Sequence, residues 1–178
     1  NVLRNGLACL LLLAGGAVVF AGEPGPQAII GKLRAQCFTL LREAMSNENS
    51  FVRSAAVRAA GESGDSALLD LLMKGGGDIH PTTRLFALQA LVKISAEDAY
   101  ALAKTLLNDA DVWVQGAALE ALAGTGGKKA IPLIKPFLIA PDVTVRLAAS
   151  ASLYRLGEKN LVIFDTLNGT DATLRYQA

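Results

Sequence analysis

The chain has 178 residues, enough for one globular domain or one short repeat array. Hydrophobic residues make up 52% of it and aromatic residues only 6%, and Ala and Leu, which favour helices, dominate the apolar share. The 17 basic and 16 acidic residues give a formal net charge of +1, which excludes the strongly basic surface typical of nucleic-acid-binding proteins. We therefore expect an all-α protein that binds no nucleic acid.

The N-terminal residues 1–21 have the pattern of a secretory signal peptide. Arg4 gives a positive start, an uncharged apolar run extends from Leu7 to Phe20, and cleavage is predicted after Ala21. The run has roughly 14 residues, fewer than the ~20 that span a bilayer. We expect export to the periplasm or the medium, and a membrane anchor only if the segment stays uncleaved.

A short linker and a leading helix are predicted next. Glycines and prolines in residues 22–26 break any helix, and residues 27–46 fit a helix. Loss of the leader removes Cys9 and leaves Cys37 as the remaining cysteine, so no internal disulfide is expected. Because leucines surround Cys37, its thiol is predicted to be buried.

From position 49 onward the sequence repeats with a period of about 31 residues, in the range typical of helical repeat arrays. Arg53, Arg84 and Arg146 share one column, Gln115 replaces the arginine between the last two, and Arg175 follows after a slightly shorter step. Four positions before each member of this column stand residues most of which are common N-cap types: Asn49, His80, Asp111, Asp142 and Asp171. Apolar columns keep the same step: Ala56, Ala87, Ala118 and Ala149; Leu71, Leu102, Leu133 and Phe164; Leu68, Ala99, Ala130 and Leu161; Ala60, Leu91, Leu122 and Leu153.

Each repeat is predicted to be a helical hairpin whose first helix ends at a glycine-rich or polar break. The expected units are 49–79, 80–110, 111–141 and 142–170, with a partial unit at 171–178. Since one hairpin cannot bury its apolar face alone, residues 27–178 are predicted to form an α-solenoid.

Two features make the predicted second helices unequal. The run Gly75–Gly77 is interpreted as a loop that shortens the second helix of the first unit. Pro132 and Pro136 are expected to make the second helix of the third unit irregular, because an interior proline removes a backbone hydrogen bond.

The segments 142–157, DVTVRLAASASLYRLG, and 51–61, FVRSAAVRAAG, resemble HEAT-like repeats of the phycobilisome-lyase (PBS lyase) type. The shared pattern is D-x-x-V-R-x-x-A-x-x-x-L-G. The resemblance implies an armadillo-like superhelix of about four and a half such repeats. It leaves function open, because the same repeat serves unrelated partners. It also implies two alternatives: a lyase that attaches bilins to phycobiliproteins, or a chaperone-like relative.

No catalytic motif accompanies the repeats. The single histidine, His80, occupies a helix-cap position, and neither a G-x-S-x-G sequence nor an H-E-x-x-H sequence occurs. We expect no enzyme activity, no metal and no cofactor. A third alternative is a repeat module of a larger exported redox protein, which would carry its haem motif elsewhere.

Two aromatic residues are the main binding candidates. Phe51 and Trp113 occupy the same position two units apart, where the other units have Thr82 and Thr144. This column therefore tolerates polar side chains and is expected to be at least half exposed. The two rings either anchor a partner or cover a groove between units.

Two sets of charged residues complete the candidates. The lysines Lys104 and Lys135 share a column on the second helices, and with Lys128 and Lys129 they form either a modest basic patch or an ordinary solvated face. The arginine column is interpreted as a structural ladder to acidic caps, with Arg53, Arg84, Arg146, Arg175, Asp111, Asp142 and Asp171 as its members. The sequence thus favours an exported scaffold or adaptor that binds another protein.

Overall fold

The computed structural model describes residues 25–158. The predicted leader, most of the predicted linker, the end of the fourth unit and the partial fifth unit lie outside the described residues. The helices are α2 (Pro26–Ala44), α3 (Ser50–Ser63), α4 (Leu69–Gly76), α5 (Pro81–Ile94), α6 (Ala96–Leu106), α7 (Val112–Gly126), α8 (Ile131–Ile134) and α9 (Val143–Arg155). Short 3-10 turns cover Ser66–Leu68, Gly127–Ala130 and Lys135–Ile139.

Backbone contacts divide the chain inside α2, between Cys37 and Phe38, and each part is described by itself. In the first part, the described side chains of α2 are exposed, and Cys37 is among them. The prediction of a buried thiol is wrong, because Cys37 is exposed and Leu33, one of the leucines that were expected to enclose it, is itself 55% accessible. None of the described helices is long and apolar enough to cross a membrane.

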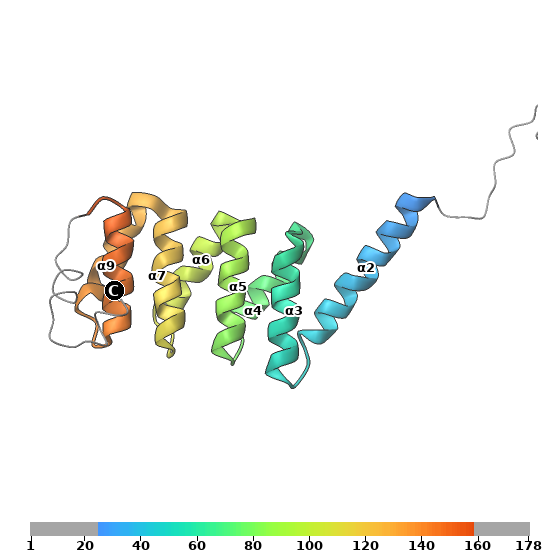
Figure 1. Ribbon diagram of the computed structural model, residues 1–178, viewed down its shortest axis with the longest axis horizontal. Helices are drawn as coiled ribbons and strands as arrows, with labels where there is room; N and C mark the ends of the chain where they lie inside the picture. Colours follow the sequence, from blue (N-terminus) through green and yellow to red (C-terminus); the bar gives the residue numbers. More distant parts are fainter. Residues whose placement is uncertain (1–24, 159–178) are drawn as a thin grey trace, which may run out of the picture. The chain divides into compact units, whose positions relative to one another are not determined.

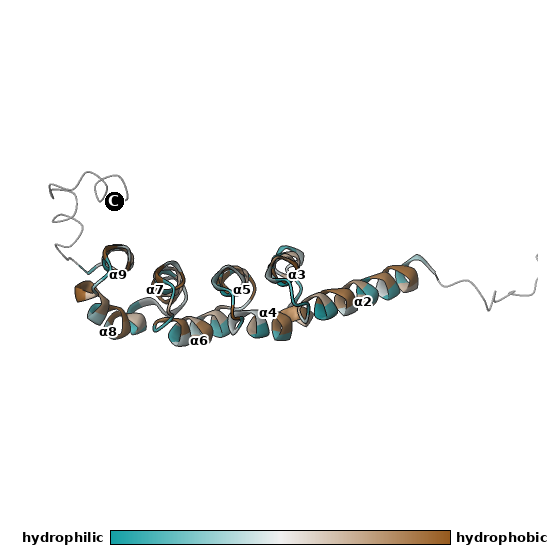
Figure 2. Ribbon diagram, turned by 90° about the horizontal axis from the view of Figure 1, so that it is seen from below, coloured by the Kyte–Doolittle hydropathy of each residue, from teal (hydrophilic) through white to brown (hydrophobic). Residues whose placement is uncertain are grey.

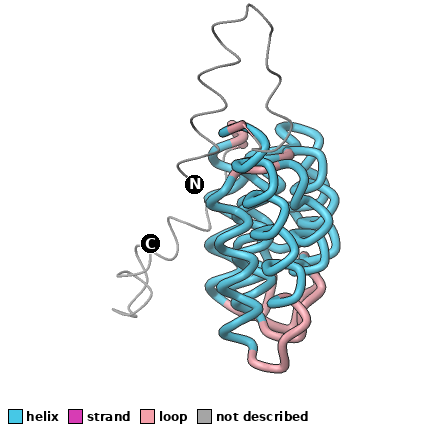
Figure 3. Tube along the Cα trace, turned by 90° about the vertical axis from the view of Figure 1, so that its right-hand side faces the viewer, coloured by secondary structure: helices cyan, strands magenta, loops and turns pink. Residues whose placement is uncertain are grey.

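In the second part, the helices form two rows (Figure 1). The first helices of the repeats, α3, α5, α7 and α9, stand side by side, and α4, α6 and α8 lie along one side of that row (Figure 2). Each first helix packs against the next one, and α4 and α6 pack against α5 and α7. The part of the chain that the structure describes contains helices, turns and loops but no strand (Figure 3). This architecture is the predicted all-α solenoid.

The core lies between the two rows, and the repeating columns supply it. Most positions that share a column are buried alike, because each unit presents a similar face to its neighbours; Leu133, in the irregular third unit, is only partly buried. Buried members of these columns are Ala56, Ala87, Ala118, Ala149, Ala60, Leu91, Leu122, Leu153, Leu68, Ala99, Ala130, Leu71 and Leu102.

The predicted caps begin the first helices. Asn49 Oδ1 accepts a hydrogen bond from Phe51 N, and Asp111 and Asp142 each accept two from the first turn of their helices. His80 occupies the cap position of α5 without a side-chain capping bond, and the following Pro81 starts the helix. Three helices or hairpin turns end at glycines with positive φ: Gly64, Gly127 and Gly157.

The glycine run after α4 differs from its prediction as a loop. α4 continues through Gly76, and both Gly75 and Gly76 are buried. A Cβ at Gly75 would lie 2.7 Å from Val57 Cγ2, and one at Gly76 would lie 2.6 Å from Leu102 Cδ1. Glycine fits these positions because α4 lies close to neighbouring side chains, which would have to shift to admit a larger residue.

The second helix of the third unit is irregular, as predicted from its prolines. The chain passes through the turn Gly127–Ala130, the four-residue α8 and the turn Lys135–Ile139. Pro132 lies at the start of α8 and Pro136 at the start of the turn Lys135–Ile139. In the first turn of a helix the backbone N–H has no partner within the helix, so proline is tolerated there.

Candidate protein-binding surface

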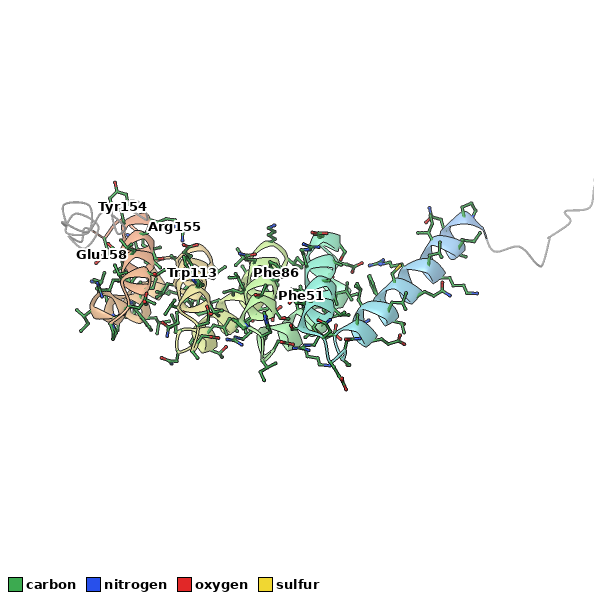
Figure 4. All side chains as sticks on the ribbon, turned by 60° about the horizontal axis from the view of Figure 1, so that its bottom comes forward. Phe51, Phe86, Trp113, Tyr154, Arg155 and Glu158 are labelled. Atoms are coloured by element: carbon green, nitrogen blue, oxygen red, sulfur yellow. The ribbon has the colours of Figure 1, made fainter. Side chains whose placement is uncertain are left out.

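Large aromatic side chains stand exposed on the first helices α3, α7 and α9 (Figure 4). Phe51 on α3 is 81% accessible, Trp113 on α7 is 63% accessible and Tyr154 on α9 is 71% accessible. Phe86 on α5 is half-buried between them. The structure therefore confirms the exposure expected for the column of Phe51 and Trp113.

Trp113 borders a groove of about 480 Å³ that spans α5, α7 and α9. We call it the Trp113 groove. Its walls are mainly apolar, because small residues on α7 and α9 leave room between larger neighbours. A Cβ at Gly116 would lie 3.5 Å from Ala148 Cβ, an ordinary van der Waals distance, so α7 and α9 lie close together here without a steric clash. The lining residues are Leu85, Gln89, Trp113, Gly116, Ala117, Glu120, Thr144, Leu147, Ala148 and Ala151.

A second groove of about 320 Å³ lies between α3 and α5, beside Phe51. We call it the Phe51 groove. The hydroxyl oxygens of Ser54 and Thr83 share a buried hydrogen bond of 2.7 Å beneath it, and Nδ1 of His80 is buried without a hydrogen-bond partner among the described residues. The lining residues are Ser50, Phe51, Ser54, Ala55, Arg58, His80, Thr82 and Phe86.

The two grooves occupy equivalent places in the array. Six of their lining positions correspond at a separation of two repeats, and the pairs are Phe51 and Trp113, Ser54 and Gly116, Ala55 and Ala117, Arg58 and Glu120, Thr82 and Thr144, and Phe86 and Ala148. The aromatic column therefore marks alternate junctions between first helices. Sequence reasoning identified the two aromatic rings and considered a groove between units beside them, but it could not name the lining, because only packing brings the small residues of neighbouring helices together.

The arginine column forms a ladder with acidic partners other than those predicted. Arg53 donates to both carboxylate oxygens of Asp78, and Arg84 does the same to Asp109. Each aspartate stands 25 residues after its arginine and just before the cap of the next first helix. The caps do not take the predicted role: Oδ1 of Asp111 and Oδ1 of Asp142 accept hydrogen bonds from N–H groups of their own helices.

The same arginines also hold the turn before their own helix. Nη1 of Arg53 donates to the carbonyls of Asn47 and Glu48, and that of Arg84 to the carbonyls of Asp78 and Ile79. Arg146 makes the equivalent bonds to the carbonyls of Ala140 and Pro141. The predicted ladder members Arg175 and Asp171 lie outside the described residues.

The ladder is interrupted at the junction of α7 and α9. Gln115 replaces the arginine, and Ala140 occupies the position that Asp78 and Asp109 hold at the other junctions. Both partners of the ion pair are thus absent together. This is the junction over which the Trp113 groove opens.

Electrostatics stabilise the charged form of Asp78. The hydrogen bond from Arg53 lowers the pKa of Asp78 below its ordinary value, opposed by burial and helped by a backbone hydrogen bond from His80. The same pair raises the pKa of Arg53. The side chains of Asp78 and Arg53 are only 6% and 12% accessible, so water screens this ion pair little.

The predicted basic residues line neither groove. The side chains of Lys104, Lys128, Lys129 and Lys135 lie on α6 and on the turns around α8, away from the lining of both grooves. Lys135 Nζ lies 2.7 Å from Glu158 Oε2, which offsets its charge. The basic patch therefore stays a prediction, with Lys135 contributing little to it. Within residues 25–158 no group of three or more His, Cys, Asp or Glu side chains is placed to hold a metal ion.

Comparisons with known proteins agree with the fold. The family described as HEAT repeats matches residues 76–155. Residues 76–155 are therefore similar to HEAT repeats, and the described repeats form an α-solenoid. A solved structure, the complex of CpcE and CpcF of phycocyanin lyase from Nostoc sp. PCC7120, contains a chain of similar fold, with a TM-score of 0.57 and 24% sequence identity. The similarity covers 90% of the present chain and 77% of that chain. A comparison with curated proteins finds no match.

Proposed function

We propose that this protein is an exported, non-catalytic scaffold that binds another protein through the face formed by its first helices. The observation that carries the proposal is the pair of equivalent apolar grooves, each bordered by an exposed aromatic ring, Phe51 or Trp113. Tryptophan and other large aromatics concentrate binding energy in protein interfaces. Burying one such side chain contributes about 1.5–3 kcal/mol.

The frame that carries the grooves favours binding. Each first helix packs on the next and on a second helix, so the grooves exist before a partner arrives. A preformed surface loses little conformational entropy when it binds, and more of the contact energy then appears as affinity. Extended surfaces of this kind suit a scaffold or adaptor that joins other proteins.

Export rests on the leader at residues 1–21, which lies outside the described residues. We propose cleavage after Ala21 by a signal peptidase. Expression of the full chain followed by cell fractionation and N-terminal sequencing tests this proposal. A mature protein that begins at Gly22 in the exported fraction supports it, and an intact leader in the cytoplasmic fraction contradicts it.

Trp113→Ala tests the binding surface, and Tyr154→Ala is the matched control. Tyr154 is 71% exposed on α9 and lines neither groove. The tagged protein and both variants are used to recover partners from the cells of origin, and their melting temperatures are measured in parallel. We expect Trp113→Ala to lose the partner at an unchanged melting temperature, while Tyr154→Ala keeps it. Lower stability of Trp113→Ala with unchanged partner recovery would show that Trp113 only covers the core.

Bilin attachment or a chaperone task is the second candidate, favoured by the structural similarity to a chain of a phycocyanin lyase complex. The purified protein is incubated with a free bilin and an apo-phycobiliprotein, and the product is separated under denaturing conditions. Bilin fluorescence that stays with the apoprotein only when this chain is present would establish the lyase activity. Absence of a covalent adduct supports the non-catalytic scaffold.

A further inference from the structure

The spacing of the two grooves restricts what binds them, provided that the first-helix face is the binding surface proposed above. Neighbouring packed helices lie about 8–10 Å apart, so two grooves two repeats apart are separated by roughly 16–20 Å. The intervening unit has Thr82 where the grooves have Phe51 and Trp113. A partner that fills both grooves therefore needs two apolar side chains at this distance and tolerates a polar surface between them.

The backbone of that partner must meet its own hydrogen-bonding needs. Residues 25–158 contain no strand, so they offer no sheet edge to which an extended peptide adds. An extended segment on this face would have to pair its N–H and C=O groups with the few polar side chains of the lining, such as Gln89, Thr82 and Thr144. An α-helix satisfies these groups internally and places widely spaced side chains on one face, so a single segment meets both requirements.

Helix geometry then gives the spacing of the anchors. At about 1.5 Å per residue, eleven residues span roughly 16–17 Å, and about three turns return the side chain to the same face. The Trp113 groove is the larger, at about 480 Å³ against 320 Å³, and suits an aromatic anchor. The Phe51 groove suits a leucine.

The charges that line the grooves give the bound helix a direction. Corresponding positions carry Arg58 in the Phe51 groove and Glu120 in the Trp113 groove. Arg58 is exposed and lies 3.8 Å from Glu62, a distance and exposure that leave the pair weak. Nη2 of Arg155 donates a hydrogen bond to the backbone carbonyl of Glu120, not to its carboxylate. An acidic residue beside the leucine and a basic residue beside the aromatic anchor complement these charges.

We propose that the partner presents a single amphipathic α-helix that lies across α3, α5, α7 and α9. Its two apolar anchors, about eleven residues apart, occupy the Phe51 groove and the Trp113 groove, and opposite charges beside the anchors set its direction.

Synthetic helical peptides test this proposal with the full mature chain. The first peptide is alanine-based, with Leu and Phe eleven residues apart, Glu beside Leu and Lys beside Phe. The second has the same composition with the anchors seven residues apart, which brings the second anchor to the unit of Thr82. The third has the first spacing with Glu and Lys exchanged. Trp113 is the only tryptophan of the chain, so its fluorescence reports on the groove directly and yields Kd.

We expect the first peptide to bind at least about tenfold more tightly than the second, since the second loses one buried anchor. Exchange of the charges should weaken binding by about three- to tenfold at low salt. Gly116→Leu, which fills the Trp113 groove, should lower the affinity for the first peptide to that for the second. Ala151→Glu places a charge at an exposed lining position and should do the same without disturbing the core.

Equal Kd values for the first two peptides would overturn the proposal of a two-anchor helix. The proposal would also fail if neither peptide bound detectably. Unchanged binding of the first peptide by both groove variants, with normal melting temperatures, would also overturn it. These outcomes are separate from failure of the proposed function. Partner recovery that depends on Trp113, together with no preference for the spaced peptide, leaves the scaffold standing and rejects the helix.

Discussion

Arg53 and Asp78 form a two-point ion pair, in which Nε donates to Oδ2 at 2.6 Å and Nη2 donates to Oδ1 at 2.9 Å. The pair joins α3 to the turn that precedes α5, while the remaining nitrogen of Arg53 binds the turn that precedes α3. One side chain thus connects the entrances of two successive repeats. Arg84 and Asp109 repeat this connection one unit later.

Asp78→Asn should lower the free energy of unfolding by more than Asp70→Asn does, because it removes the counter-charge of a guanidinium that is only 12% accessible. Asp70→Asn is the control, since Asp70 pairs with Arg42 in an exposed ion pair whose side chains are 64% and 43% accessible. Its cost should not exceed about 1 kcal/mol. Urea denaturation followed by circular dichroism measures both values. Similar losses for the two variants would mean that burial does not strengthen the ladder.

The lowered pKa of Asp78 predicts a loss of stability in acid. The hydrogen bond from Arg53 is the main cause of the lowered pKa, so the folded state holds Asp78 ionised at a pH where the unfolded chain, with a pKa of about 3.9, takes up a proton. The contribution is therefore present above about pH 4 and is lost as the pH falls through the lowered folded value. Denaturation curves from pH 6 to pH 2 should show a smaller decline for Asp78→Asn than for the unmodified protein. Parallel declines would place the acid sensitivity elsewhere.

Restoring the interrupted ladder should stabilise the junction of α7 and α9. The carbonyl of Ala140 accepts from Arg146 as the carbonyl of Asp78 accepts from Arg84, so the backbone at Ala140 is placed like that of the ladder aspartates. We expect Gln115→Arg combined with Ala140→Asp to show a favourable coupling of about 1–2 kcal/mol in a double-mutant cycle. Thermal denaturation of the two single variants and the double variant provides the cycle. A coupling of zero would show that the junction differs from the others in more than its side chains.

Gly76→Ala should destabilise the protein by about 1–3 kcal/mol, because the added Cβ would lie 2.6 Å from two methyl carbons of Leu102. Gly124→Ala is the matched control inside α7, where an added Cβ meets nothing within 4 Å. There the higher helix propensity of alanine should stabilise the protein by about 0.5–1 kcal/mol. Chemical denaturation of both variants checks the opposite signs. A neutral Gly76→Ala would mean that α4 shifts away from α6 at little cost.

The period of the sequence was sufficient to predict the solenoid. Columns such as Ala56, Ala87, Ala118 and Ala149 keep one constant step, and a position that recurs with the repeat is buried or exposed alike in every unit. Helix starts were predictable for a local reason, because a cap such as Asp142 bonds to residues two and three positions ahead.

Predictions failed where the outcome depends on what lies across from a residue. Cys37 was expected to be buried among leucines, yet its side chain and that of Leu33 are exposed. Gly75 and Gly76 were predicted to form a loop, but the closeness of neighbouring helices keeps them in α4. The acidic partners of the arginines were assigned to the caps, whereas the fold brings Asp78 and Asp109 to them from 25 residues away.

The sequence by itself determined the repeat, the helix starts and the two aromatic positions Phe51 and Trp113, since all three depend on local spacing or on the period of the chain. Only the tertiary structure decided that these rings border grooves and that the larger groove opens where the arginine ladder is interrupted. The physical reason is that a groove is the space left between side chains of different helices. Its size depends on the distance between their backbones, which close packing sets and sequence spacing does not.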